Sequence, residues 1–196
     1  MLPRGWSRVR PRGWGTNLLQ VIDSFLPASV RQEGLRASYE DWSAPDGEIY
    51  KRIAICEVPG LCDAIEAQVG AVDMLGMGYR LNFGGELPNA AIHSDMGWGT
   101  HAAVVYLSEG EGGTAFWRHK ATGAERLDPG DVDLFDQIKD DWNDEMKWEM
   151  ARLVEMQIGR GLIYESARFH SRYPFPAFGT GPDDGRLVAV AFFTPR

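Results

Sequence analysis

The sequence has only two cysteines among its 196 residues, Cys56 and Cys62. Two cysteines are too few for a secreted disulfide framework, and their spacing is not that of a zinc ribbon. The arginine-rich start over residues 1–15 also lacks the apolar stretch of a secretory signal. We therefore interpret the cysteines as ordinary thiols of a reducing compartment and predict a cytoplasmic location, with residues 1–15 as an unstructured or surface-laid arm.

Long apolar runs and an excess of positive charge are missing too. No apolar run approaches the roughly 20 residues that cross a bilayer, so we expect no membrane span. The formal net charge of -8 argues against broad binding to nucleic acid or anionic membranes, and it favours a small-molecule or peptidyl substrate. The length fits one domain over residues 1–196, and no internal repeat divides it. The sequence carries no signal for the oligomeric state.

The hydrophobic pattern changes near residue 76. Before it we predict an α/β elaboration, with a strand in residues 17–27 and helices in residues 28–42 and 61–73. From residue 76 to residue 196, short apolar runs are divided by glycine, proline and aspartate, which is typical of a β-sandwich or barrel. The expected strands are YRLNF, HAAVVYL, GTAFW, DVDLF, GLIYES and LVAVAFF.

One segment interrupts this β pattern. Residues 138–156 are acidic and rich in residues with high helix propensity, and large apolar residues recur there every three or four positions. These residues are Trp142, Met146, Met150 and Leu153. We predict an inserted helix near 138–156 and propose that it acts as a lid over the substrate.

The chain has four histidines, and two of them, His93 and His170, lie near expected strand ends where they are candidate metal ligands. His93 and Asp95 are two residues apart, so in an extended segment they face the same side. His170 follows another short strand and supplies a second imidazole. Two histidines and one carboxylate that leave open positions form the facial triad suited to non-haem Fe(II). Alone, a His-x-Asp pair is more often a surface pair or a capping interaction, so the prediction depends on further groups in the right order.

Arg186 is such a group. It stands at the head of the apolar strand RLVAVAFF, where a guanidinium can grip a carboxylate bidentately across a barrel. Standing alone, it would more simply be an arginine at the edge of a surface strand.

Taken together, the motifs resemble a known family. The series HSD, VVYL, GGTAFW, LDPGDVDLF, FHS and GRLVAVAFF is similar to that of the Fe(II)/2-oxoglutarate-dependent dioxygenases, in particular the prolyl 4-hydroxylase-like branch. The resemblance extends over about residues 79–194. It implies a mainly β fold: a double-stranded β-helix (jelly roll, cupin-like) core, with the N-terminal helices buttressing one sheet.

The resemblance also implies residue roles. His93, Asp95 and His170 would be the iron ligands, and Arg186 would bind the distal carboxylate of 2-oxoglutarate, with Tyr79 as a further hydrogen-bond donor to that carboxylate. The implied reaction uses O2 to hydroxylate an unactivated C–H bond of a small molecule, amino acid or peptidyl side chain, with release of succinate and CO2. The carboxylate of Asp95 favours hydroxylation over halogenation, because related halogenases have a small residue in its place.

Several alternatives stay open. A cupin-like metal enzyme that does not use 2-oxoglutarate would share the barrel and the metal ligands. A non-catalytic jelly-roll binding module would contain the same three residues without catalytic function. If the loop PFPAFGTGPDDG does not fold back, Arg168 or Arg172 replaces Arg186 as the partner of the co-substrate. For the other candidate residues we expect His101 beside the metal ligands, His119 solvated at a hairpin turn, and Trp98 and Trp117 lining a pocket.

Overall fold

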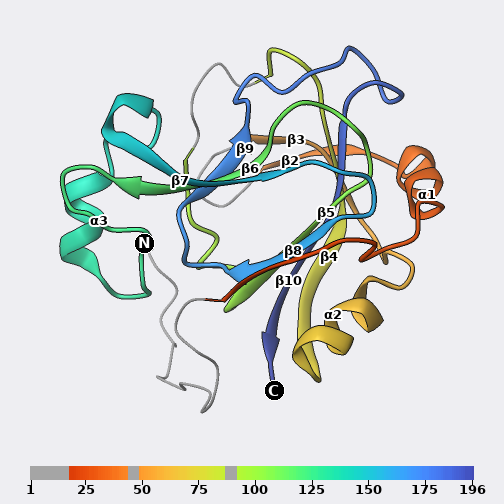
Figure 1. Cartoon of the computed structure of the whole chain (residues 1–196), viewed down its shortest axis with the longest axis horizontal. Helices are drawn as coiled ribbons and strands as arrows, with labels where there is room; N and C mark the ends of the chain where they lie inside the picture. Colours follow the sequence, from red (N-terminus) through yellow and green to blue (C-terminus); the bar gives the residue numbers. More distant parts are fainter. Residues whose placement is uncertain (1–17, 44–48, 87–91) are drawn as a thin grey trace.

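The computed structural model describes residues 18–43, 49–86 and 92–196, and it contains two antiparallel sheets (Figure 1). The larger sheet has seven strands in the order β1 (Leu19–Ile22), β8 (Gly161–Glu165), β5 (His101–Tyr106), β10 (Arg186–Pro195), β4 (Val72–Asn82), β3 (Ile49–Ile55) and β2 (Glu40–Ser43). The smaller sheet has three, in the order β7 (Trp148–Glu155), β6 (Gly113–His119) and β9 (His170–Tyr173). The two sheets form the predicted jelly-roll core. Within the described ranges, no helix is long and apolar enough to cross a membrane.

Two helices cover the outer face of the larger sheet, as predicted. Helix α1 (Val30–Arg36) packs on β10, and α2 (Leu61–Val69) packs on β4. The α2 sequence buries every fourth side chain, so one face of the helix enters the apolar cluster beneath it. We call this the helix-side cluster; its largest members include Leu61, Ile65, Tyr79, Leu81, Leu187 and Phe193.

The segment after α1 differs from the prediction. The helix ends at Arg36, and residues 40–43 form strand β2 instead of continuing the helical pattern towards residue 42. Strand β3 was also missed, and it connects β2 to β4 in the larger sheet. The N-terminal part of the chain therefore contributes strands to the main sheet as well as helices that buttress it.

The predicted strand at DVDLF is wrong, because this segment forms helix α3 (Val132–Ile138). Its start is fixed by Asp131, whose carboxylate accepts a hydrogen bond from the backbone N–H of Leu134 at 3.1 Å. A side-chain oxygen at this place satisfies an amide that the first helical turn leaves without a partner. The local cap therefore outweighs the alternating apolar pattern.

The inserted helix near 138–156 is also wrong. Helix α3 ends at Ile138, a short 3-10 turn η1 covers Glu145–Lys147, and residues 148–155 form strand β7. The strand pairs with β6 from His119↔Trp148 to Gly113↔Glu155. Met146, which fitted the helical spacing, is exposed. Pairing with a distant strand decides the structure here. The helix that was proposed as a lid does not form, so the lid proposal is not supported.

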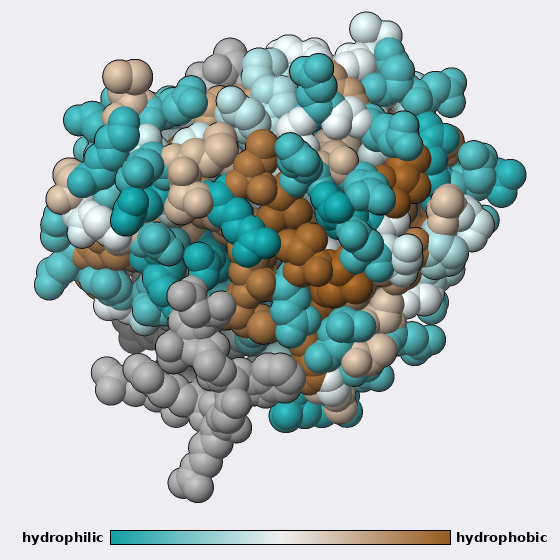
Figure 2. All heavy atoms as spheres, viewed as in Figure 1, coloured by the Kyte–Doolittle hydropathy of each residue, from teal (hydrophilic) through white to brown (hydrophobic). Residues whose placement is uncertain are grey.

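The space between the two sheets is filled mainly by apolar side chains. Strands of both sheets contribute to it by alternation, because every second residue of a strand faces the same side. We call this group the interior cluster: Ala102, Val104, Tyr106, Phe116, Val154, Met156, Leu162, Tyr164 and Val188. On the molecular surface, Figure 2 shows hydrophobic residues gathered in a band near the centre of the view and hydrophilic residues around it.

Candidate metal centre

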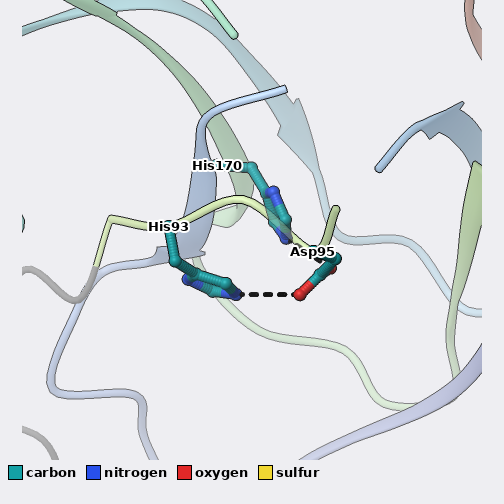
Figure 3. Close-up of side chains that lie close together, drawn as sticks. All are labelled: His93, Asp95 and His170. Atoms are coloured by element: carbon teal, nitrogen blue, oxygen red, sulfur yellow. Dashed lines mark ion pairs between the residues drawn. The ribbon is translucent and has the colours of Figure 1, made fainter. Parts of the chain in front are cut away.

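His93, Asp95 and His170 converge at one point, as the sequence predicted (Figure 3). One ligand atom from each of the three lies within 4.8 Å of the others. Asp95 Oδ1 is 3.5 Å from Nε2 of His93, and Asp95 Oδ2 is 3.1 Å from Nε2 of His170. Two imidazoles and one carboxylate at this spacing match the donor set of a facial Fe(II) site.

The backbone holds the three ligands in place. His93 and His170 form an antiparallel β-bridge, in which each backbone N–H donates to the carbonyl of the other at 2.9 Å. The N–H of Asp95 donates to the carbonyl of Ser166, directly after β8, at 2.7 Å. Segments far apart in the sequence are thus joined at the site by main-chain hydrogen bonds.

The hydrogen bonds of His170 leave Nε2 facing the carboxylate. Its Nδ1 lies 2.9 Å from the carbonyl of Arg168, so Nδ1–H donates there and fixes the orientation of the ring. Burial alone would lower the pKa of His170, but the charge of Asp95 raises it. Burial alone would raise the pKa of Asp95, but His170, His93 and Arg80 hold it below its usual value. A divalent cation can replace the proton between these groups.

The loop before β10 folds back and brings Arg186 between the sheets. The N–H of Gly84 donates to the carbonyl of Gly179 at 2.8 Å, and the carboxylate of Asp184 accepts from the N–H groups of Thr180 and Gly181. Arg186 is 6% exposed, and its guanidinium lies 5.9 Å from the centre of the Tyr106 ring.

The charge of Arg186 has no counter-ion in the part of the chain that the structure describes. No ion pair joins it to a carboxylate there, and its buried Nε has no hydrogen-bond partner. Burial lowers the pKa of Arg186 to about 10, and the neighbouring Arg80 guanidinium acts in the same direction. An unpaired buried charge lowers the stability of the folded protein, so this arginine is suited to binding an anionic ligand.

Tyr79 is not brought to the triad. It lies on the face of β4 that carries the helix-side cluster, where its ring contacts the position of Gly34 on α1. Burial raises the pKa of its hydroxyl to about 12. The adjacent residue, Arg80, points to the opposite face and interacts electrostatically with Asp95. Arg80 was not among the predicted site residues, although it is the only charged residue in the run GMGYRLNF.

Arg168 and Arg172, the alternative partners, differ in their surroundings. Arg168 Nη2 lies 3.4 Å from a carboxylate oxygen of Glu125. Arg172 stands two residues after His170 on β9 and therefore faces the same side, and its Nε donates to the carbonyl of Phe175 at 2.6 Å.

The other two histidines contact residues outside the triad. His101 Nδ1 is 2.9 Å from the hydroxyl of Thr100, and its ring stacks on Phe193 of the helix-side cluster. The expectation that His119 is solvated is wrong, because its side chain is buried and hydrogen-bonded to Thr122 and Asp141.

The two tryptophans expected to line a pocket differ in location and exposure. Trp117 is buried behind the smaller sheet, where its Nε1–H donates to Ser171 Oγ at 3.0 Å. Trp98 is half-exposed and lies 5.8 Å from Phe192, between ring centres, at the end of the interior face of β10.

Residues 90–193, which include the three candidate ligands and Arg186, match a family of proteins of unknown function, DUF6445. The chain belongs to this family. A search of the curated proteins found no match.

The fold of this family member is similar to that of solved oxygenases. SnoK, a non-heme alpha-ketoglutarate-dependent carbocyclase from nogalamycin biosynthesis, matches with a TM-score of 0.57 and 14% identity, over 90% of this chain and 79% of that one. The epimerase SnoN from the same biosynthesis matches with a TM-score of 0.56 and 15% identity, over 89% and 77%. A Pseudomonas putida prolyl 4-hydroxylase matches with a TM-score of 0.55 and 17% identity, over 91% and 93%. The chain therefore has the jelly-roll fold of the Fe/2-oxoglutarate oxygenases, as its motifs predicted.

Proposed function

We propose that this protein is an Fe(II)- and 2-oxoglutarate-dependent oxygenase that hydroxylates an unactivated C–H bond of a small molecule, amino acid or peptidyl side chain. A fold can serve several chemistries, so the proposal depends on the site itself. The observation that carries it is the joint presence of the His93, Asp95 and His170 triad and the buried, unpaired Arg186. The metal and the dicarboxylate co-substrate each have a matching set of groups.

Each part of the site has a distinct task. The two imidazoles and the Asp95 carboxylate would hold Fe(II), and Arg186 would hold the distal carboxylate of 2-oxoglutarate by charge-assisted hydrogen bonds. When bound, Fe(II) and 2-oxoglutarate supply the oxidation of the substrate by O2, with release of succinate and CO2. Arg186 orients the co-substrate because its place on β10 is fixed by pairing with β4 and β5.

The interior cluster supports this chemistry by excluding water. Tyr106, Phe116, Tyr164 and Val188 are almost fully buried between the sheets, and the rings of Phe116 and Tyr164 lie next to His170. Electrostatic attraction is stronger in such a dry environment, so a carboxylate at Arg186 is held more tightly than at the surface. We also infer a reducing compartment, such as the cytoplasm, because Cys56 and Cys62 are both free thiols.

Anaerobic titration of the protein with Fe(II) and then with 2-oxoglutarate tests the proposal. The wild type should show the visible charge-transfer band of a 2-oxo acid chelated to iron, and His93→Ala and His170→Ala should lose it. His119→Gln is the matched control, since this histidine is buried but hydrogen-bonds away from the triad, and it should keep the band. Arg186→Gln should still bind Fe(II) and lose at least about tenfold in 2-oxoglutarate affinity.

Other outcomes would favour the alternatives. Iron binding without the band, together with an Arg186→Gln variant of unchanged activity, would indicate a cupin-like metal enzyme that does not use 2-oxoglutarate. Absence of metal binding would leave a jelly-roll binding module. Once the band is established, release of succinate in the presence of candidate compounds identifies the substrate.

A further inference from the structure

Three arginines meet between the sheets near the triad. Arg80 on β4 is in register with Val188 on β10, and Asn82 is in register with Arg186, so Arg80 and Arg186 are diagonal neighbours on one face. Arg172 approaches from β9 of the other sheet. Arg172 is in register with Thr114 on β6, and the Thr114 hydroxyl accepts a hydrogen bond from Tyr106, over whose ring the Arg186 guanidinium lies at 5.9 Å.

These arginines lack counter-ions within the described residues. No carboxylate there forms an ion pair with any of the three, and each has one buried nitrogen without a hydrogen-bond partner: Nε of Arg80 and Arg186, and Nη2 of Arg172. Arg52 and Arg126, by contrast, form ion pairs with Glu86 and Glu165. Arg186 is buried, and Arg80 and Arg172 are partly buried. A charge that is removed from water without a counter-ion lowers stability, so this cluster suggests that bound anions complete the site.

The co-substrate alone does not neutralise this cluster. Fe(II), the Asp95 carboxylate and dianionic 2-oxoglutarate together carry a single negative charge. With Arg186 assigned to 2-oxoglutarate, one buried nitrogen of Arg80 and one of Arg172 stay without a hydrogen-bond partner among the described residues. Ring contacts connect Arg80 to the ligand segment: its guanidinium lies over Tyr50, Tyr50 contacts Trp42, and Trp42 contacts Trp98, whose backbone N–H donates to the carbonyl of Asp95 at 2.9 Å. A second acidic group is therefore expected beside the iron, on the side of β4.

An aromatic wall continues from Arg80 towards solvent. The guanidinium lies 5.3 Å from the centre of the Tyr50 ring, and Tyr50 and Trp42 are 5.7 Å apart. Trp42 and Trp98 are 5.3 Å apart, and Trp98 and Phe192 are 5.8 Å apart. None of the four rings is fully buried, and Trp98 is half-exposed. Such a row suits a ligand with an apolar or aromatic body next to its charged group.

We propose that the substrate of this site is an organic acid, whose carboxylate or phosphate group binds Arg80 and Arg172 while its apolar body packs on the aromatic wall of Trp42, Tyr50, Trp98 and Phe192. This inference rests on the proposed function and narrows its substrate class. It assigns to Arg80 and Arg172 a role separate from that of Arg186.

The test uses the Ni(II) and 2-oxoglutarate complex of the full chain, in which Ni(II) occupies the iron site and no turnover occurs. Isothermal titration calorimetry compares two acidic probes, 3-phenylpropionate and phenyl phosphate, with the neutral 3-phenylpropanamide. At least one acid should bind at least about tenfold more tightly than the amide, which corresponds to about 1.4 kcal/mol. The acid that binds more tightly shows whether the site prefers a carboxylate or a phosphate.

Two variants locate the effect. Arg80→Gln should remove the preference for the acid while binding 2-oxoglutarate within about threefold of the wild type. Arg80 is suitable because no hydrogen bond to another described residue is lost with it, and circular dichroism and the Tm check that the variant folds. Arg36→Gln, at an exposed position on α1, removes the same charge and should keep the preference.

Two results would overturn the proposal. One is equal binding, or no binding, of the acids and the amide by the wild type. The other is an Arg80→Gln variant that loses 2-oxoglutarate as strongly as Arg186→Gln does, which would assign all three arginines to the co-substrate. If the wild type forms no 2-oxoglutarate complex at all, the proposed function itself fails, and the same titrations on the Ni(II) protein show whether the arginines still select acids.

Discussion

The hydroxyl of Tyr164 lies 3.1 Å from Nε2 of His170, the same nitrogen that faces Asp95. Because Nδ1 of His170 donates to the carbonyl of Arg168, Nε2 is the nitrogen available to a metal. A cation must therefore compete for this nitrogen with the proton shared with Asp95 and with the hydrogen bond to Tyr164. Tyr164 is fully buried, so its hydroxyl must find another hydrogen-bond partner when a metal is bound.

Removal of this competition should strengthen metal binding. We expect Tyr164→Phe to bind Ni(II) about three- to tenfold more tightly than the wild type, which corresponds to one hydrogen bond of about 1 kcal/mol. Calorimetric titration of the apo-protein measures this. Tyr106→Phe is the matched control, because the Tyr106 hydroxyl donates to Thr114 and Val154 and does not contact the triad. A tenfold loss of affinity in Tyr164→Phe would show instead that the hydroxyl orients the His170 ring.

Gly112 and Gly123 both have a positive φ, but their surroundings differ. A Cβ at Gly112 would overlap the carbonyl oxygen of Tyr173 at the end of β9, whereas a Cβ at Gly123 meets nothing within 4 Å. We expect Gly123→Ala to cost about 1 kcal/mol, from backbone strain alone. Gly112→Ala adds a backbone clash to that strain and should cost about 3 kcal/mol or more. Urea unfolding of the two variants measures the difference, and equal costs would contradict the close approach at Gly112.

The triad could be predicted from the sequence because its chemistry depends on residue type and short spacing. His93 and Asp95 are two residues apart, and the motif series supplied the order in which His170 and Arg186 follow. Helix α2 could be predicted because Leu61, Ile65 and Val69 lie one turn apart and are all buried. These features need only local periodicity, which the sequence carries directly.

Features that depend on distant pairing could not be predicted. Trp142, Met146 and Met150 fit a helical period, but pairing of β7 with β6 makes residues 148–155 a strand. Tyr79 and Arg80 are adjacent on β4, so one faces the helices and the other the interior, and a shift of one residue exchanges them. The register with β10 places Arg80 inside, and no local signal fixes that register.

Helix α2 offers a direct measure of how much the helix-side cluster stabilises the fold. Ile65 is fully buried beneath the helix, and Gln68 on the same helix is exposed. We expect Ile65→Ala to lower the free energy of unfolding by about 2 to 5 kcal/mol, because it removes apolar contacts and leaves a cavity. Gln68→Ala should change it by no more than about 0.5 kcal/mol. Since alanine is a good helix former at both positions, helix propensity does not account for a difference, and a similar cost at the two sites would argue against the packing of α2 on the sheet.

Asp184 gives the loop before Arg186 a dependence on pH. Its carboxylate accepts hydrogen bonds from the backbone N–H groups of Thr180 and Gly181, and these lower its pKa below the usual value. A carboxyl group with a lowered pKa in the folded state adds stability above its unfolded pKa of about 4, and this stability is lost as the pH falls through the folded pKa. Asp184→Asn should therefore be less stable than the wild type at pH 7, and the gap should close as the pH falls below about 4. Thermal unfolding from pH 7 to pH 2 measures the gap, with Asp183→Asn as the control that removes the same charge from the same loop. If the gap stays constant over this range, the loop that carries Arg186 into the interior does not depend on the ionised Asp184 carboxylate.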